Sequence, residues 1–189
     1  MAGPDEAAAA LDALDLDAPA GRQLLAYLRC LDAWAARINL TGARTATERC
    51  RLLIAGIVPL APHLLAGPVL DIGSGNGSPG LVLAALRPEL PMTLLEPRQR
   101  RWAFLREAAR AMGRGDIEIL RQRHDEYRGP AVSNVVVRAV ALPLRELAPL
   151  TGPRGQALLI GRREDAAGSG FEEPEAVGAS AYRYRRCST

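Results

Sequence analysis

A glycine-rich turn after residue 72 combines residue types that suit the binding of a nucleoside ligand. Val69–Ile72, typical of a buried strand, leads into Gly73-Ser74-Gly75-Asn76-Gly77-Ser78-Pro79-Gly80 and then into an apolar helical stretch. Glycine permits positive φ angles and lets a ligand approach the backbone closely. Asp71 precedes the first glycine by two positions, and Glu96 follows Gly75 by 21 residues, at the end of the next predicted strand. A carboxylate placed there accepts hydrogen bonds from ribose hydroxyls, so the turn predicts a nucleoside-binding site.

Two ligand classes use a turn of this kind, and the glycine spacing alone leaves both open. The dinucleotide pattern G-x-G-x-x-G fails from Gly73, because the sixth position is Ser78, but it is satisfied from Gly75. Asp71 and the glycines at 73, 75 and 77 instead resemble motif I of class I S-adenosylmethionine (SAM) methyltransferases. That resemblance implies SAM rather than a nicotinamide cofactor, with Asp71 serving the methionine ammonium through water and Glu96 the ribose.

The segment after the third predicted strand is expected to face the adenine. Asp125, or else Glu126, can accept the adenine amino group there, although an ordinary solvated turn explains the same residues. The predicted cofactor-binding residues are Asp71, Gly73, Ser74, Gly75, Asn76, Gly77, Glu96, Pro97, His124 and Asp125.

Alternating strand-like and helical stretches must position these residues. The predicted strands are Val69–Ile72, Met92–Glu96, Ile117–Leu120, Val135–Val140 and Ala157–Ile160. The predicted helices run from the glycine turn to Leu86, over Arg98–Met112 and over Leu144–Leu150. This alternation predicts an α/β, Rossmann-like fold with a mostly parallel central sheet and helices on both faces. Such sheets bind ligands at the carboxyl ends of their strands.

The N-terminal third predicts a helical extension of the same single domain. Residues 1–21 are expected to form a solvated acidic arm, residues 22–66 the N-terminal helices, 67–163 the SAM-binding core and 164–189 a shortened C-terminal segment. Apolar spacing predicts one helix over Arg22–Ile38 and a second from Thr45 or Thr47 to just before Pro59. Ala179–Arg186 is a candidate final strand.

Composition excludes several classes of protein. The 189 residues are 48% apolar, which suits one folded domain, and all 24 basic residues are arginine, which excludes any lysine-based chemistry. Three cysteines without C-x-x-C spacing and only two histidines predict no metal site and a reducing compartment. Without a secretory signal or a long apolar segment, the chain is expected to be cytoplasmic, with no membrane partner.

The charge is uneven along the chain. Residues 1–21 carry five acidic and no basic side chains. Because the whole chain has a net charge of +3, the remaining 168 residues carry +8. This basic excess is compatible with binding RNA or a small anionic molecule and does not discriminate between the two.

From about residue 24 to residue 160, the sequence resembles the glucose-inhibited division protein B family. The residues that carry the resemblance are Trp34, Asn39-Leu40-Thr41, the glycine turn, Arg87-Pro88, Thr93–Glu96, Arg100-Arg101, Phe104–Arg106 and Arg138–Ala141. The resemblance implies a bacterial enzyme that methylates guanine N7 in the decoding-region loop of 16S ribosomal RNA.

Several positions depart from the family pattern. Arg51–Gly56 stands where the family usually has Arg-His-x-x-Asp-Ser, and Val137, Ser78 and Gly161 replace a serine, an aromatic residue and a lysine. The tail also looks too short for the family's last two strands. Because these changes make the expected substrate wall more apolar, the favoured interpretation is a small-molecule substrate of specialised metabolism. The reaction would be methyl transfer, or a sulfonium-based cyclisation that forms, for example, a cyclopropane. The alternatives are the ribosomal RNA of the small subunit and a binding module without catalysis.

Alkyl transfer from a sulfonium is an in-line displacement that mainly needs alignment and exclusion of water. Guanine N7 has a free lone pair and needs no general base, which suits a chain with so few histidines. Arg138 and Asn39 are the predicted catalytic residues. The predicted substrate-binding residues are Thr41, Arg51, Leu52, Ala55 and Ser78.

Overall fold

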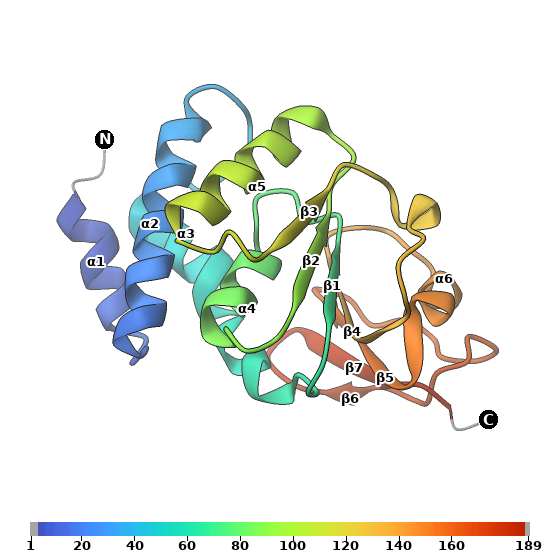
Figure 1. The fold of residues 1–189 in the computed structure, drawn as a ribbon. Helices are drawn as coiled ribbons and strands as arrows, with labels where there is room; N and C mark the ends of the chain where they lie inside the picture. The colour runs from blue at the N-terminus through green and yellow to red at the C-terminus, as the bar shows by residue number, and fades with distance from the viewer. Residues whose placement is uncertain (1–3, 188–189) are drawn as a thin grey trace.

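The computed structural model describes residues 4–187 and contains a seven-stranded sheet in the order β3-β2-β1-β4-β5-β7-β6 (Figure 1). The strands are β1 (Val69–Ile72), β2 (Met92–Leu95), β3 (Glu118–Leu120), β4 (Val132–Arg138), β5 (Thr151–Ile160), β6 (Glu175–Ala176) and β7 (Ala181–Arg185). The first five strands are parallel, and β7 is antiparallel to β5 and β6. The predicted Rossmann-like fold with a mostly parallel sheet is confirmed.

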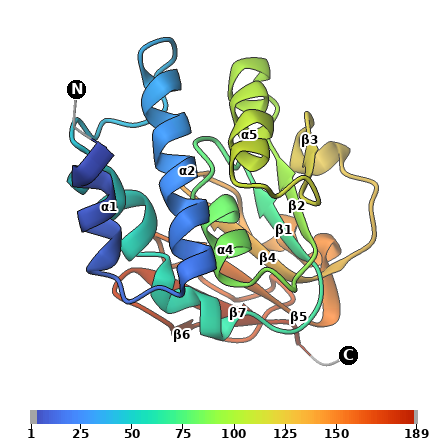
Figure 2. The ribbon, with the colours of Figure 1, turned by 60° about the vertical axis from the view of Figure 1, so that its left-hand side comes forward.

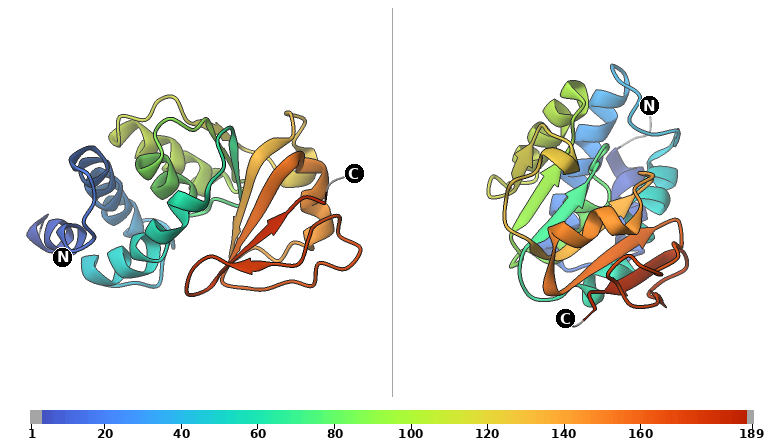
Figure 3. Two further views of the ribbon diagram at one scale, coloured as in Figure 1. Left: turned by 90° about the horizontal axis from the view of Figure 1, so that it is seen from below. Right: turned by 90° about the vertical axis from the view of Figure 1, so that its right-hand side faces the viewer.

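The sheet separates two hydrophobic cores, because successive residues of a strand point to opposite faces. In β4, Val136 belongs to one core, whereas Val135 and Val137 belong to the other. The first face is covered by α4 (Gly80–Leu86), α5 (Gln99–Ala111) and the N-terminal helices. The second face is covered by α6 (Leu144–Leu147) and the segments around it. Figure 3 (left) shows the blue to yellow-green helices on one side of the sheet and the orange α6 on the other.

The N-terminal extension is helical, and it starts earlier than the sequence predicts. Residues 1–21 are not a solvated arm where the structure describes them: α1 (Pro4–Asp12) buries Ala7 and Leu11, which lie four residues apart on one helix face. The next helix, α2 (Ala18–Ala35), begins four residues before Arg22, with Asp17 as its N-cap. Figure 2 shows α1 packed along α2, and α2 beside α5. Residues 1–3 of the predicted arm lie outside the described residues.

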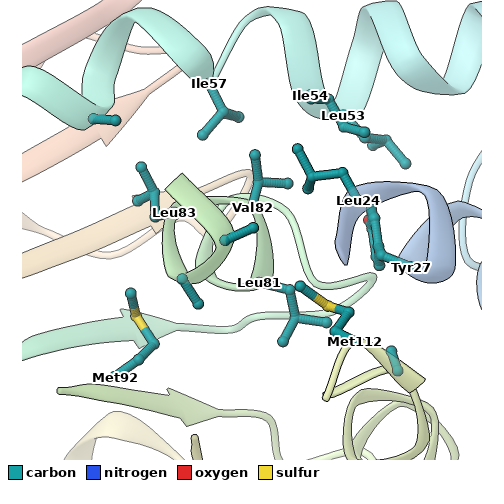
Figure 4. Close-up of a cluster of buried hydrophobic side chains, with 14 of the residues drawn as sticks. Leu24, Tyr27, Leu53, Ile54, Ile57, Leu81, Val82, Leu83, Met92 and Met112 are labelled. Atoms are coloured by element: carbon teal, nitrogen blue, oxygen red, sulfur yellow. The ribbon is translucent and has the colours of Figure 1, made fainter. Parts of the chain in front are cut away.

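After a loop that follows α2, three short helical segments lead toward the sheet. Thr45 caps α3 (Ala46–Arg49), as one of the two predicted starts requires. The chain continues as a π-helix, η1 (Cys50–Ala55), and a 3-10 helix, η2 (Val58–His63). Their apolar side chains pack on α4, as Figure 4 shows for Leu53, Ile54 and Ile57 around Leu81–Leu83.

The C-terminal segment corrects the prediction that the tail is too short for two more strands. Residues 175–176 and 181–185 form β6 and β7 and complete the sheet beside β5. Tyr184 of β7 is fully buried in the second core. β5 also begins six residues earlier than predicted. β6 has only two residues, so no alternating pattern marked it in the sequence. Residues 188–189 lie outside the described part of the chain.

The remaining short turns are η3 (His124–Glu126), after β3, and η4 (Ala148–Leu150), after α6. Over residues 4–187, no helix is both long enough and apolar enough to span a membrane.

Candidate functional site

A cleft of about 650 Å³ opens at the carboxyl ends of β1, β2, β3 and β4. Its volume lies in the usual range for sites that hold a small molecule or a cofactor. The lining comes from the glycine turn, the ends of these four strands with the segments that follow them, and the N-terminal layer. The lining residues are Leu40, Leu53, Ile72, Gly73, Ser74, Gly75, Asn76, Ser78, Leu95, Glu96, Pro97, Arg98, Arg101, Gln122, Arg123, His124, Arg138, Ala139, Val140, Ala141 and Leu142.

Glu96 joins the glycine turn to the end of β2. Its side chain is buried, with the residue only 3% exposed, and one carboxylate oxygen accepts the Gly75 backbone N–H at 3.0 Å. The other oxygen accepts the Arg98 backbone N–H at 2.8 Å. Each carboxylate oxygen has a second lone-pair direction, so Glu96 can still accept two further hydrogen bonds.

This arrangement fits a ribose-bearing cofactor such as SAM. A buried carboxylate fixed by two amides lines the cleft beside glycine backbone, which leaves room for a ligand against the main chain. Gly73, Ser74, Gly75 and Asn76 line the cleft with Glu96 and Pro97, as the sequence predicts. Gly77 does not line it; its φ of +89° serves the turn itself.

Asp71 lies behind the glycine turn rather than in the cleft. It is fully buried, and its Oδ2 accepts the Gly80 backbone N–H at 3.1 Å, which ties the end of β1 to the start of α4. Oδ1 is buried and has no hydrogen-bond partner within the described residues. The placement favours a role in shaping the loop over direct contact with a ligand.

Burial raises the pKa of Asp71 to about 7. The native protein therefore keeps a proton that the unfolded chain loses above its ordinary pKa of about 4. We expect the contribution of Asp71 to the free energy of unfolding to fall by about 2–4 kcal/mol as the pH rises from about 4 to 7. Asp71→Asn should flatten this dependence in urea unfolding, whereas Asp116→Asn, at an exposed carboxylate, should not. Equal slopes in both variants would contradict the prediction.

The N-terminal helices hold the glycine turn from the other side. The buried Tyr27 of α2 donates its hydroxyl hydrogen bond to the Asn76 carbonyl at 2.8 Å. The Asn76 side chain donates to the Leu40 carbonyl at 3.1 Å. Burial raises the pKa of Tyr27, so its hydroxyl remains a donor. The cofactor loop and the N-terminal layer are therefore one connected structure.

Arg138 connects three elements at the floor of the cleft. One guanidinium nitrogen donates to Ser78 Oγ at 2.7 Å, and another donates to the Leu52 carbonyl of η1 at 2.7 Å. Ser78 Oγ donates in turn to the Leu53 carbonyl at 2.6 Å. Burial lowers the pKa of Arg138. The next residue, Ala139, has a φ of +55°, a left-handed conformation that non-glycine residues rarely adopt.

We expect Arg138→Ala to lower the free energy of unfolding by about 1–3 kcal/mol, because it leaves the Leu52 carbonyl and Ser78 without a donor. Urea unfolding of this variant, Ser78→Ala and the double variant would measure the coupling. A coupling energy of roughly 0.5–1.5 kcal/mol is expected. A coupling near zero would show that the Arg138–Ser78 contact contributes nothing to stability. Arg145→Ala, at an exposed arginine of α6, is the matched control.

The remaining predicted substrate and catalytic residues do not line the cleft. Asn39, Arg51 and Leu52 are exposed, and Ala55 is half-buried on η1. Thr41 uses its hydroxyl to accept the Ala43 backbone N–H at 3.2 Å. The cleft is lined instead by Leu40, which follows Asn39, and by Leu53, which follows Leu52. The expectation that Leu52 and Ala55 form an apolar substrate wall is therefore wrong in geometry.

On the predicted adenine side, the structure brings in His124 but not Asp125. His124 lines the cleft, and its Nε2 lies 2.8 Å from Glu146 Oε2 of α6. Asp125 points to Arg123, at 3.1 Å, outside the cleft. Gln122 is a lining residue that the sequence analysis missed. Its place two residues after β3 is the signal that could have identified it.

No group of three or more histidine, cysteine, aspartate or glutamate side chains within residues 4–187 could hold a metal ion.

Comparison with known proteins agrees with this fold. The family model described as "GidB: rRNA small subunit methyltransferase G" matches residues 20–165. A Halorhodospira halophila protein named ribosomal RNA small subunit methyltransferase G is 34% identical over 168 residues, which is 87% of this chain and 79% of that protein. The protein of the same name from Methylobacillus flagellatus is 33% identical over 124 residues. That match covers 66% of this chain and 60% of the relative, so the chain spans only part of the relative's length.

Solved structures of low sequence identity share the fold. Precorrin-6y C5,15-methyltransferase from Geobacter metallireducens has a TM-score of 0.56 at 16% identity, covering 74% of this chain and 92% of that one. A SAM dependent methyltransferase from Aquifex aeolicus has a TM-score of 0.55 at 16% identity, with the same coverage. The architecture is thus that of SAM methyltransferases. With a family model that matches most of its length, the chain belongs to the GidB family.

Proposed function

We propose that this protein is a SAM-dependent methyltransferase whose substrate is the ribosomal RNA of the small subunit. The observation that carries the proposal is the cleft itself. It brings together the glycine turn, the end of β4 and Glu96, whose carboxylate is held by backbone N–H groups. The family model matches residues 20–165 of the same chain. The names of the relatives support RNA as the substrate class.

The residues of this chain would hold the cofactor and exclude water. Bound SAM supplies an electrophilic methyl group on a sulfonium. Glu96 accepts the ribose hydroxyls, and the backbone of Gly73–Asn76 faces the rest of the ligand. The apolar side chains of Leu40, Leu53 and Leu142 exclude water from the cleft. The acceptor we propose is guanine N7, whose lone pair needs no deprotonation, so no general base is required of His124.

The residues on which the small-molecule interpretation rested lie outside the cleft lining. That interpretation depended on Leu52 and Ala55 forming a drier and roomier wall, but neither lines the cleft. Among the altered positions, Ser78 lines the cleft, and its hydroxyl accepts a hydrogen bond from Arg138. The comparisons also favour the RNA alternative over a metabolite.

The test is methyl transfer from labelled SAM to small ribosomal subunits that lack the decoding-region N7 methyl group. We expect label in 16S RNA at guanine N7, and much less label with the Glu96→Gln protein at a SAM concentration near the Kd of the unmodified protein. Binding of SAM is measured on the same preparation by calorimetry. Cofactor binding without label in the RNA would contradict the proposed substrate.

A further inference from the structure

Five arginines follow the carboxyl ends of the neighbouring strands β2 and β3, where the cleft opens. They are Arg98, Arg100, Arg101, Arg121 and Arg123, called the arginine rim below. The strands β2 and β3 are parallel neighbours in which Leu95 pairs with Leu120, and the Glu96 N–H donates to the Leu120 carbonyl at 3.1 Å. The two arginine segments leave the sheet directly after these paired residues. The rim is therefore continuous although its members come from separate parts of the sequence.

The rim presents positive charge to solvent with little internal neutralisation. Arg101 is half-buried and the other four arginines are exposed. Arg98, Arg101 and Arg123 also line the cleft. Within residues 4–187, only Arg123 among the five has a carboxylate partner, Asp125 at 3.1 Å. An exposed ion pair of this kind contributes little, so the rim keeps most of its charge.

These arginines are not explained by the stability of the fold. Three of them surround the beginning of α5, whose first turn contains no acidic residue. Basic side chains at the N-terminal end of a helix oppose the helix dipole and slightly destabilise it. Trp102 and Arg106, farther along α5, stack on each other and do not neutralise the rim. The uncompensated charge calls for an external anion.

We propose that the arginine rim binds the phosphate backbone of the ribosomal RNA and holds its target base over the cleft. The inference rests on the proposed function. An RNA strand carries one phosphate per nucleotide on both sides of a base held in the cleft, and Arg98, Arg101 and Arg123 line that cleft. Arginine binds phosphate bidentately, and phosphate contacts fix register without reading sequence. With aromatics at only 4% of the chain, base stacking offers few alternative contacts.

The experiment reverses the charge of the two rim arginines that do not line the cleft, Arg100 and Arg121. In Arg100→Glu/Arg121→Glu, we expect the Kd for SAM to be unchanged. The Kd for small subunits and for naked 16S RNA, measured by filter binding, should rise roughly 10- to 100-fold. Each single Arg→Gln change should reduce the slope of log K against log salt by about 1. The KM of methyl transfer for the subunit should rise more than kcat falls.

The matched control is Arg22→Glu/Arg154→Glu, with the same change in net charge. Arg154 lies near the amino end of β5, opposite the cleft, and Arg22 lies near the beginning of α2, 18 residues before Leu40. Equal RNA affinity of the rim and control variants would overturn the inference. The inference would also be overturned if the rim substitutions weakened binding to whole subunits but not to naked RNA. That result would identify a ribosomal protein as the partner of the rim.

Failure of the proposed function has a different signature. In that case the unmodified protein binds SAM but transfers no methyl group to RNA, whatever the rim variants do. The binding measurement still tests the rim, because it does not depend on turnover.

Discussion

Glu96→Gln lowers the affinity for SAM roughly 100- to 1000-fold, because the change acts on the ligand and on the loop together. A carboxylate accepts charge-assisted hydrogen bonds, which contribute more than neutral ones. Both of its oxygens already accept backbone N–H groups, from Gly75 and Arg98. An amide would place an NH2 donor against one of these N–H donors. Isothermal calorimetry of SAM binding measures the effect directly.

The control for this variant is Glu118→Gln on the adjacent strand β3. Glu118 is exposed and accepts only the Thr93 hydroxyl at 3.1 Å, so its amide variant should bind SAM as the unmodified protein does. Circular dichroism of both variants confirms that the sheet is intact. An unchanged affinity in Glu96→Gln would remove Glu96 from the cofactor site and leave the cleft without its only buried acidic lining residue among the described positions.

Gly73→Ala should destabilise the protein by about 2–4 kcal/mol, which combines backbone strain with steric overlap. Gly73 has a φ of +71°, where an L residue is strained. A Cβ at this position would also overlap Cγ2 of Val140, across the cleft. Chemical denaturation gives the free energy of unfolding, and we expect SAM binding to weaken in parallel because the turn must shift.

Two further variants separate strain from overlap. Gly113, after the end of α5, has a φ of +73° with open space around its Cβ position, so Gly113→Ala should cost only the backbone strain of about 1 kcal/mol. Val140→Ala combined with Gly73→Ala should recover the part caused by overlap. If Gly73→Ala costs no more than Gly113→Ala, the contact with Val140 is not a steric constraint.

The sequence predicts those parts of the fold where one local signal dominates. β1 has the predicted bounds of 69–72, because a short apolar run before glycines leaves little ambiguity. The helix α1 was missed within the predicted solvated arm, although Ala7 and Leu11 lie at helical spacing, because alanine contributes little to an apolar pattern. β7 falls within the candidate strand Ala179–Arg186, whereas β6 was missed because it has only two residues and is selected by pairing with β7 rather than by local preference.

In the candidate site, the cofactor side could be predicted from the sequence and the substrate side could not. The glycine turn and Glu96 could be located because their residue types are required by backbone conformation and ligand chemistry. The side toward the substrate could not be predicted, since its geometry depends on which face of η1 is buried. Leu53 lines the cleft, whereas its neighbour Leu52 is 40% exposed. A shift of one residue in the assumed register thus changed which side chain forms the wall, although both residues are leucines.

The hydrogen bond from Tyr27 to the Asn76 carbonyl makes the N-terminal layer a thermodynamic partner of the cofactor. A ligand that binds only when the turn is held in place by α2 stabilises both segments. The free energy needed to open α2 locally therefore rises when the ligand is bound. Hydrogen exchange in the middle of α2 should therefore slow when SAM binds, although α2 contributes no residue to the cleft lining. Occupancy of the nucleoside site would then be communicated to a surface on the far side of the helical layer.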